Sequence, residues 1–334
     1  MAYQNVGTPR FYVNTLEWLM SNGIEIPFVM NGNPISVFNT LPVTPTSFYA
    51  AIDTMAGLPI DYSEKSFIAV LGHNIASSGN TYELRNLNDT AFAAEDIDPV
   101  IVNENGSPYD GFSIQTLDMT DASQFIFRIL RDGNTQSTEV TVNIGSLIIG
   151  TYYDMPHSPD LNLTMTREYG GIKTIETKGG ASLSNAFYTK PPAWGDYAGA
   201  WELYAGATTG VKKEFSRSGR RIWDLSFSYL DSSDLFPPTE HQGGTIQDTT
   251  PYPDGDVWGS GTWNEDQHIL THDSFYSQVI HKTNGGQLPF IFQPDKDNNN
   301  PDQFAIAKLD MKSFKFSQKS FNTYSISLKI REVW

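Results

Sequence analysis

Short apolar runs separated by turn-forming residues fill the sequence between residues 64 and 150, and no long helical pattern interrupts them. A run of four to eight apolar residues between turn signals is typical of a buried β-strand. The sequence therefore predicts an all-β, mainly antiparallel fold, with a jelly-roll β-sandwich over residues 46–150. The expected strands of this module are 67–71, 81–87, 112–117, 124–130, 139–144 and 145–149.

Glycine and turn residues punctuate these runs. The runs at 67–71 and 145–149 are both expected to be short buried strands that end at a glycine, which is Gly150 for the second run. Asp132-Gly133 lies between the runs at 124–130 and 139–144. An Asp-Gly pair in this position is a strong signal for a tight hairpin between two strands.

The one helix expected in the chain is short and lies near the N-terminus. Leu16, Leu19 and Met20 fall at helical spacing, with Thr15 as the expected N-terminal cap and Gly23 as the expected stop. The sequence therefore predicts a short helix, or one turn of it, between the cap and this glycine.

After residue 150 the pattern changes but remains that of strands. Apolar and polar residues alternate over 222–230 and most cleanly over 324–333, which places one apolar face on each strand. Proline and glycine crowd into 232–264, which is expected to be a long loop. The predicted organisation is therefore an N-terminal segment at 1–45 that packs on the C-terminal domain, the jelly roll at 46–150, and a second β-sandwich or barrel domain at 151–334.

The overall charge limits the classes of partner. The chain carries 38 acidic and 22 basic residues among 334, a net charge of −16. Nucleic-acid binding needs clustered basic residues, so this balance argues against a specific nucleic-acid site. The start of the chain lacks the pattern of a secretion signal, and no apolar run approaches the length of a membrane span. We expect synthesis in a cytoplasm, without membrane insertion.

Three small groups of residues are candidate sites. His73 and Asn74 follow an apolar run and would either offer hydrogen bonds to a sugar at a loop rim or close a turn. Asp295, Asp297 and Asn299 alternate as the oxygen ligands of a calcium loop do, or form the tip of a hairpin. The aromatic residues that are expected to form a subunit contact, with a core plug or a ligand platform as alternatives, are Trp194, Tyr197, Trp201 and Tyr204.

Signatures of catalysis are missing from the sequence. The chain has no cysteine, no Gly-x-Ser-x-Gly nucleophile motif and no phosphate-binding Gly-x-x-x-x-Gly-Lys loop. We therefore expect no enzyme activity and no cofactor. Paired carboxylates that cleave glycans depend on separations in space, so a glycan hydrolase stays open as a minor alternative.

The order of four segments resembles that of distal tail or tail-tip (baseplate) proteins of tailed bacteriophages. The run at 67–74, which ends in Gly-His-Asn, and the strand at 144–150 are similar to elements of galactose-binding-like jelly rolls. The segments at 219–230 and 288–295 are similar to parts of the β domain of those tail proteins.

This resemblance implies a structural protein of the virion, assembled in the host cytoplasm. In that family the second domain forms a ring at the end of the tail tube, and the jelly roll projects outward from it. The implied partners are further copies of the chain and other tail proteins. The alternative is a module that binds carbohydrate on the host surface.

Overall fold

The computed structural model describes residues 6–23, 38–43, 48–53, 65–73, 80–86, 97–101, 111–117, 124–131, 140–144, 146–168, 172–186, 219–238, 240, 269–300 and 303–333. Its strands pair antiparallel throughout the described part of the chain, which confirms the all-β prediction. The strands are β1 (Arg10–Asn14), β2 (Phe38–Val43), β3 (Phe48–Asp53), β4 (Ser66–His73), β5 (Asn80–Asn86), β6 (Ile97–Ile101), β7 (Gly111–Leu117), β8 (Gln124–Arg131), β9 (Val140–Ile144), β10 (Ser146–Asp154), β11 (Thr164–Glu168), β12 (Ile172–Glu176), β13 (Ser182–Ala186), β14 (Arg220–Asp231), β15 (Phe290–Gln293), β16 (Ala305–Leu309), β17 (Ser317–Ser320) and β18 (Thr323–Glu332).

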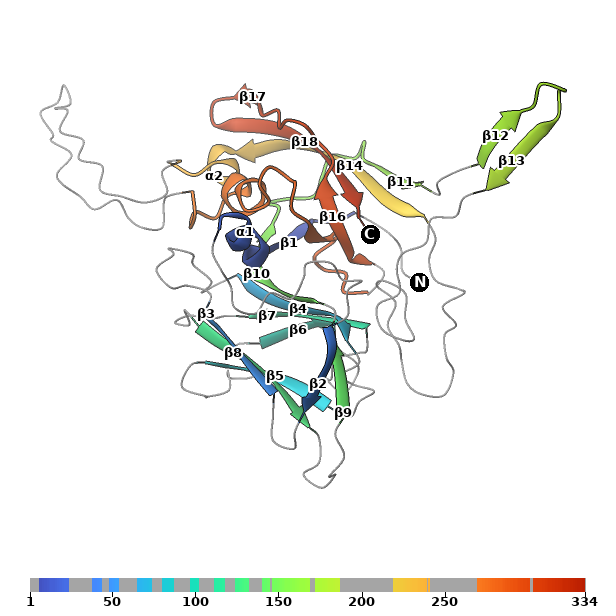
Figure 1. Cartoon of the computed structure of the whole chain (residues 1–334). Coiled ribbons are helices and arrows are strands. Elements are labelled where there is room, and N and C mark those ends of the chain that lie inside the picture. The colour runs from blue at the N-terminus through green and yellow to red at the C-terminus, as the bar shows by residue number, and fades with distance from the viewer. Residues whose placement is uncertain are drawn as a thin grey trace, which may run out of the picture.

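One large sheet runs through most of the molecule. Its strand order is β11-β14-β18-β16-β15-β1-β10-β4-β7-β6, and β17 pairs with β18 beside this path. Two further sheets, β3-β8-β5 and β2-β9, lie below β4, β7 and β6 (Figure 1). The large sheet thus joins strands from all three predicted segments, with β1 and β10 at the junction. The domain boundaries and the jelly-roll topology stay predictions.

Two local expectations are wrong. The runs on either side of Asp132-Gly133 do not form a hairpin with each other, because β8 pairs with β3 and β5 while β9 pairs with β2. Gly150 does not end a strand, because β10 continues through it to Asp154. In both cases the pairing of strands distant in sequence outweighs the local turn signal.

The core occupies both faces of the central strands. On β1, Phe11 and Val13 belong to one apolar cluster, while Tyr12 points into a second. Phe290 and Phe292 on β15 pack with the first of these clusters. A strand that is buried on both faces has a run of consecutive apolar residues, as β1 has over 11–13 and β15 over 290–292. They form the centre of the large sheet.

Three short helices complete the described structure: α1 (Thr15–Ser21), α2 (Ser232–Leu235) and the π-helix η4 (Tyr276–His281). The predicted N-terminal helix is confirmed, but its cap is Asn14, whose side chain accepts a hydrogen bond from the Glu17 backbone at 3.2 Å. Gly23 follows the helix with φ +86°, a conformation that favours glycine. Helix α2 forms the first four residues of the expected loop at 232–264.

A buried ion pair connects the two longest strands of the sheet. Arg221 on β14 donates to the Glu332 carboxylate on β18 from Nε at 3.1 Å and from Nη2 at 2.9 Å. Arg221 also donates to the Phe304 carbonyl at 2.5 Å, and its guanidinium lies 5.2 Å from the centre of the Trp223 ring. Arg221 and Glu332 are 2% and 3% exposed. Charges buried to this degree need such partners, and this pair links the start of β14 to the end of β18.

Candidate functional site

The residue that was expected to meet a sugar, His73, is buried at the end of β4. Its side chain is 0% exposed, and this burial lowers the pKa of the imidazole from 6.5 to about 3. A fully buried side chain does not offer hydrogen bonds to a ligand at the surface, so the described structure does not present His73 at a rim. Asn74 lies outside the described residues.

The burial of His73 predicts a loss of stability in acid. The imidazole stays neutral in the folded chain but takes up a proton in the unfolded chain below its ordinary pKa of 6.5. Between this value and about pH 3, His73 should therefore lower the free energy of unfolding by about 1.4 kcal/mol for each pH unit of acidification.

Urea unfolding of the native protein and of the His73→Gln variant, at pH about 7 and about 4, tests this expectation. The fall in stability between the two pH values should be smaller in the variant, because its amide does not titrate. An equal fall in the two proteins would contradict the assignment.

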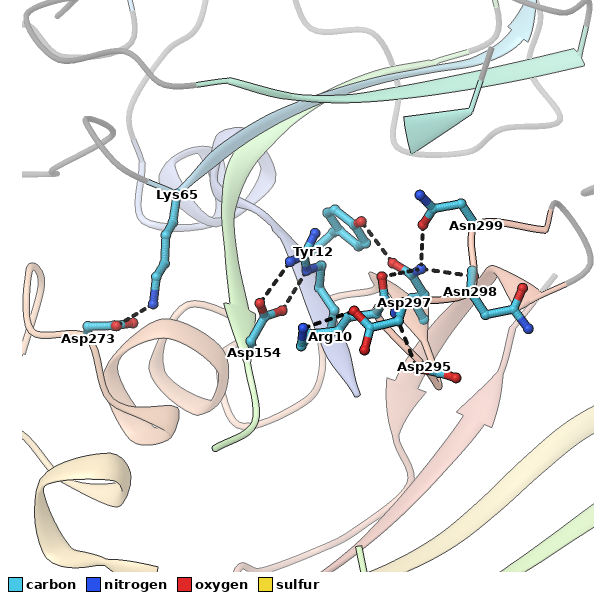
Figure 2. Close-up of polar contacts among 11 residues, drawn as sticks. Arg10, Tyr12, Lys65, Asp154, Asp273, Asp295, Asp297, Asn298 and Asn299 are labelled. Atoms are coloured by element: carbon cyan, nitrogen blue, oxygen red, sulfur yellow. Dashed lines mark hydrogen bonds and ion pairs between the residues drawn. The ribbon is translucent and has the colours of Figure 1, made fainter. Parts of the chain in front are cut away.

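The predicted calcium residues lie in a loop after β15, and their oxygen atoms make contacts within that loop (Figure 2). The Asp295 carboxylate accepts a hydrogen bond from the Asp297 backbone at 3.2 Å, and Asp297 pairs with Lys296 at 3.0 Å. The Asn299 amide oxygen accepts from Gln293 at 3.0 Å. Within the described residues no group of three or more His, Cys, Asp or Glu side chains is arranged so that it could hold a metal ion. Calcium binding here stays a prediction.

Gln293, which the sequence did not single out, organises this loop. Its buried amide nitrogen also donates to the Asn298 carbonyl at 3.0 Å, and its oxygen accepts from the Tyr12 hydroxyl at 2.9 Å. Burial raises the pKa of Tyr12 to about 12, so the hydroxyl remains a donor at neutral pH. A buried amide at the end of a strand needs several partners, and the loop provides them. These contacts give the loop a structural role.

Two ion pairs connect distant parts of the chain, and Figure 2 shows that of Arg10 and Asp154 closer to this loop than that of Lys65 and Asp273. Arg10 on β1 binds the Asp154 carboxylate on β10 through two hydrogen bonds of 2.5 and 2.8 Å, and its guanidinium lies 4.3 Å from the centre of the Tyr152 ring. Lys65, just before β4, pairs with Asp273, just before η4. Both pairs involve segments at or next to β1, β10 and β4. There the large sheet passes from the strands around β14 to the strands around β4.

The expected aromatic contact falls in the range 187–218, outside the described residues. Its four members are Trp194, Tyr197, Trp201 and Tyr204. Their role as a subunit contact stays a prediction.

The hairpin of β12 and β13 projects away from the large sheet (Figure 1). All side chains described between residues 173 and 184 are exposed. An isolated two-stranded hairpin is at best marginally stable in water. The sequence reasoning missed this hairpin, although Gly179-Gly180 between two short runs of strand-forming residues was a signal for it.

The hairpin has one apolar face. Ile175 on β12 lies directly opposite Leu183 on β13, and the two side chains are 56% and 61% exposed. Lys173 shares this face because side chains two residues apart on a strand point the same way, whereas Thr174 and Glu176 lie on the other face. We call Lys173, Ile175 and Leu183 the hairpin face. It is an apolar pair beside a single positive charge.

The hairpin follows directly from an edge of the large sheet. Among the described strands, β11 pairs only with β14, and every residue of β11 except Arg167 is exposed. Unpaired strand edges are sites where another chain can add. Strand β11 and the hairpin face therefore form the candidate interaction surface of this protein.

No protein-family model matches this chain, and neither does any curated protein or solved structure. In the described part of the chain, no helix combines the length and apolar character needed to cross a membrane. What the chain does is therefore inferred from its own residues and contacts.

Proposed function

We propose that this chain is a structural protein of a bacteriophage tail tip, which associates with copies of itself into a ring or adaptor at the end of the tail tube. The proposal combines the resemblance of four sequence segments to such proteins with one structural observation. That observation is the projecting hairpin, whose apolar pair Ile175 and Leu183 is exposed in a single copy.

The hairpin gains little stability from contacts with its own chain. Its described side chains are exposed, so burial within the monomer does not stabilise it. Apolar surface that is covered by a partner is removed from water, and this favours association by about 25 cal/mol for each Å² buried. A homo-oligomer built on such an arm uses the same element in every subunit.

Sedimentation velocity over a range of protein concentrations, with negative-stain imaging, tests the proposal. We expect oligomers of defined size, and ring-shaped particles in the images. The variant Ile175→Ser/Leu183→Ser should weaken association by about tenfold or more, because loss of about 1.4 kcal/mol of binding energy changes the dissociation constant tenfold.

A matched control uses the opposite face of the same strands. Thr174→Ala/Ser184→Ala changes two exposed polar residues that lie opposite each other, so it should leave association unchanged. A native protein that sediments as a monomer at every attainable concentration, with no ring in the images, would refute the proposal.

A further inference from the structure

Most of the exposed large apolar side chains of the described residues gather at two places. Six large apolar residues are exposed, and two of them, Ile175 and Leu183, belong to the hairpin face. Three others, Leu161, Tyr229 and Phe321, surround the C-terminal end of β14, and the sixth lies on β11. We call Leu161, Tyr229 and Phe321 the β14 corner. Apolar exposure concentrated in this way marks sites of interaction.

Hydrogen bonds place the three residues of the β14 corner around one point of the sheet. Asp160, next to Leu161, donates from its backbone to the Ser226 carbonyl at 2.7 Å and accepts from the Ser228 hydroxyl at 2.8 Å. On the other side of β14, the Ser232 backbone donates to the Asn322 carbonyl at 3.0 Å, next to Phe321. The chain segments that carry Leu161 and Phe321 therefore flank the end of β14, where Tyr229 lies.

The backbone at Tyr229 is unfavourable for this residue type. Tyr229 has φ +64° within a bulge of β14, a left-handed conformation that glycine adopts freely and bulky side chains rarely do. Its side chain is 81% exposed, and that of Phe321 is 88% exposed. Strained residues that gain nothing by burial are typical of functional positions.

The two surfaces have complementary charge. The hairpin face carries the positive charge of Lys173. The β14 corner has two acidic residues close by in sequence, Asp231 at the end of β14 and Asp234 in α2. Nearby β17 contributes one basic residue, Lys319. Hydrogen bonds from Ser233 lower the pKa of Asp231, so this carboxylate is charged at neutral pH. Opposite charges beside apolar contacts favour encounter and fix orientation.

The hairpin and the β14 corner lie at opposite ends of β14, so they cannot meet within one copy (Figure 1). We propose that the hairpin face of one copy docks on the β14 corner of a second copy. This inference rests on the proposed self-association and adds its geometry. A contact between two different surfaces is head-to-tail, and it produces a ring when the rotation between copies closes.

Cysteine cross-linking tests the contact, and the chain is suited to it because it contains no natural cysteine. Ile175→Cys and Phe321→Cys are made in separate preparations, mixed, and oxidised with copper–phenanthroline. A disulfide-linked dimer should form at least about tenfold faster in the mixture than in either preparation alone, since docking raises the effective concentration of the two thiols. Thr174→Cys, on the opposite face of the hairpin, replaces Ile175→Cys in the matched control.

A chain that carries both Ile175→Cys and Phe321→Cys should give a ladder of covalent multimers. Faster linking of Ile175→Cys to itself than to Phe321→Cys would show a symmetric hairpin contact and overturn the head-to-tail geometry. Linking no faster than in the Thr174→Cys control, in a protein that still sediments as an oligomer, would overturn the docking site and leave the proposed function standing. A monomeric native protein would refute both.

The variant Tyr229→Asn separates docking from folding. Asparagine tolerates the left-handed backbone conformation, so the melting temperature of the monomer should stay the same or rise. The dissociation constant of the oligomer should increase by about tenfold, because the aromatic anchor is lost. Unchanged association in this folded variant would contradict the role of the β14 corner.

Discussion

Replacement of Glu332 by alanine is expected to lower the free energy of unfolding by about 3–5 kcal/mol, the largest loss that we predict for a single polar side chain. The carboxylate accepts hydrogen bonds from the guanidinium and from the backbone nitrogen of Arg221, the latter at 2.9 Å. Without it, a cation that is 2% exposed loses its counter-charge inside the sheet. The cost is therefore mainly that of an uncompensated buried charge.

Chemical unfolding of the native protein and the variant measures this cost, and an exposed ion pair supplies the control. On the same sheet, Nη2 of Arg331 lies 2.6 Å from a carboxylate oxygen of Glu168, but the two side chains are 34% and 44% exposed. Glu168→Ala should cost about 1 kcal/mol or less, because water solvates the remaining guanidinium. Equal losses in Glu168→Ala and Glu332→Ala would contradict the argument from burial.

A double variant tests the cause of the loss. Arg221→Met/Glu332→Leu removes both charges and fills the space with apolar side chains, so it should recover most of the stability that Glu332→Ala loses. If the double variant is as unstable as Glu332→Ala, hydrogen-bond geometry at this site contributes more than charge balance.

The sequence predicted those elements whose pattern of residues is local. The period-two alternation in residues 324–333 corresponds to β18, with Ile326, Leu328 and Ile330 buried on one face. The helical spacing after residue 15 corresponds to α1. In these segments a single face is buried, so the pattern of side chains specifies the element directly.

Pairings between strands that are distant in the chain could not be predicted from the sequence. Asp132-Gly133 is a sound local signal, yet β8 finds its partners in β3 and β5, and even the residues of β5 lie 39 to 51 positions from their partners in β8. The ion pair of Arg221 and Glu332 joins residues 111 positions apart. Neither alternation nor turn signals contain this information, because they describe only what each strand can do by itself.

The candidate site was harder to predict than the fold. Single histidines and alternating acidic residues drew attention because they resemble ligands, but His73 is buried and Asn299 binds Gln293. In the hairpin of β12 and β13, residues 173–184 are ordinary exposed residues. The hairpin becomes a candidate site only because the fold makes it project from the large sheet, and the sequence does not show this.

Substitution of Gly150 by alanine is the second change with a large expected effect, about 3 kcal/mol of lost stability. On the central strand β10, Gly150 lies opposite Asn14, where β1 turns into α1. A β-carbon at Gly150 would lie only 1.8 Å from the Val13 carbonyl oxygen and 2.8 Å from the Thr15 nitrogen. These are backbone atoms held by the sheet and the helix, so they cannot move aside as a flexible side chain would.

Thermal unfolding of Gly150→Ala beside Gly179→Ala checks this expectation. Gly179, in the hairpin turn, has open space around its Cα position, so its substitution should change stability by less than about 0.5 kcal/mol. Any glycine-to-alanine change alters the flexibility of the unfolded chain, and Gly179→Ala measures this general effect. The additional loss in Gly150→Ala then reports the close approach of β10 to the start of α1. If both variants unfold at the temperature of the native protein, the strand-to-helix turn does not lie against Gly150. The result matters for function because β10 is the strand through which the large sheet continues from the group around β14 to the group around β4.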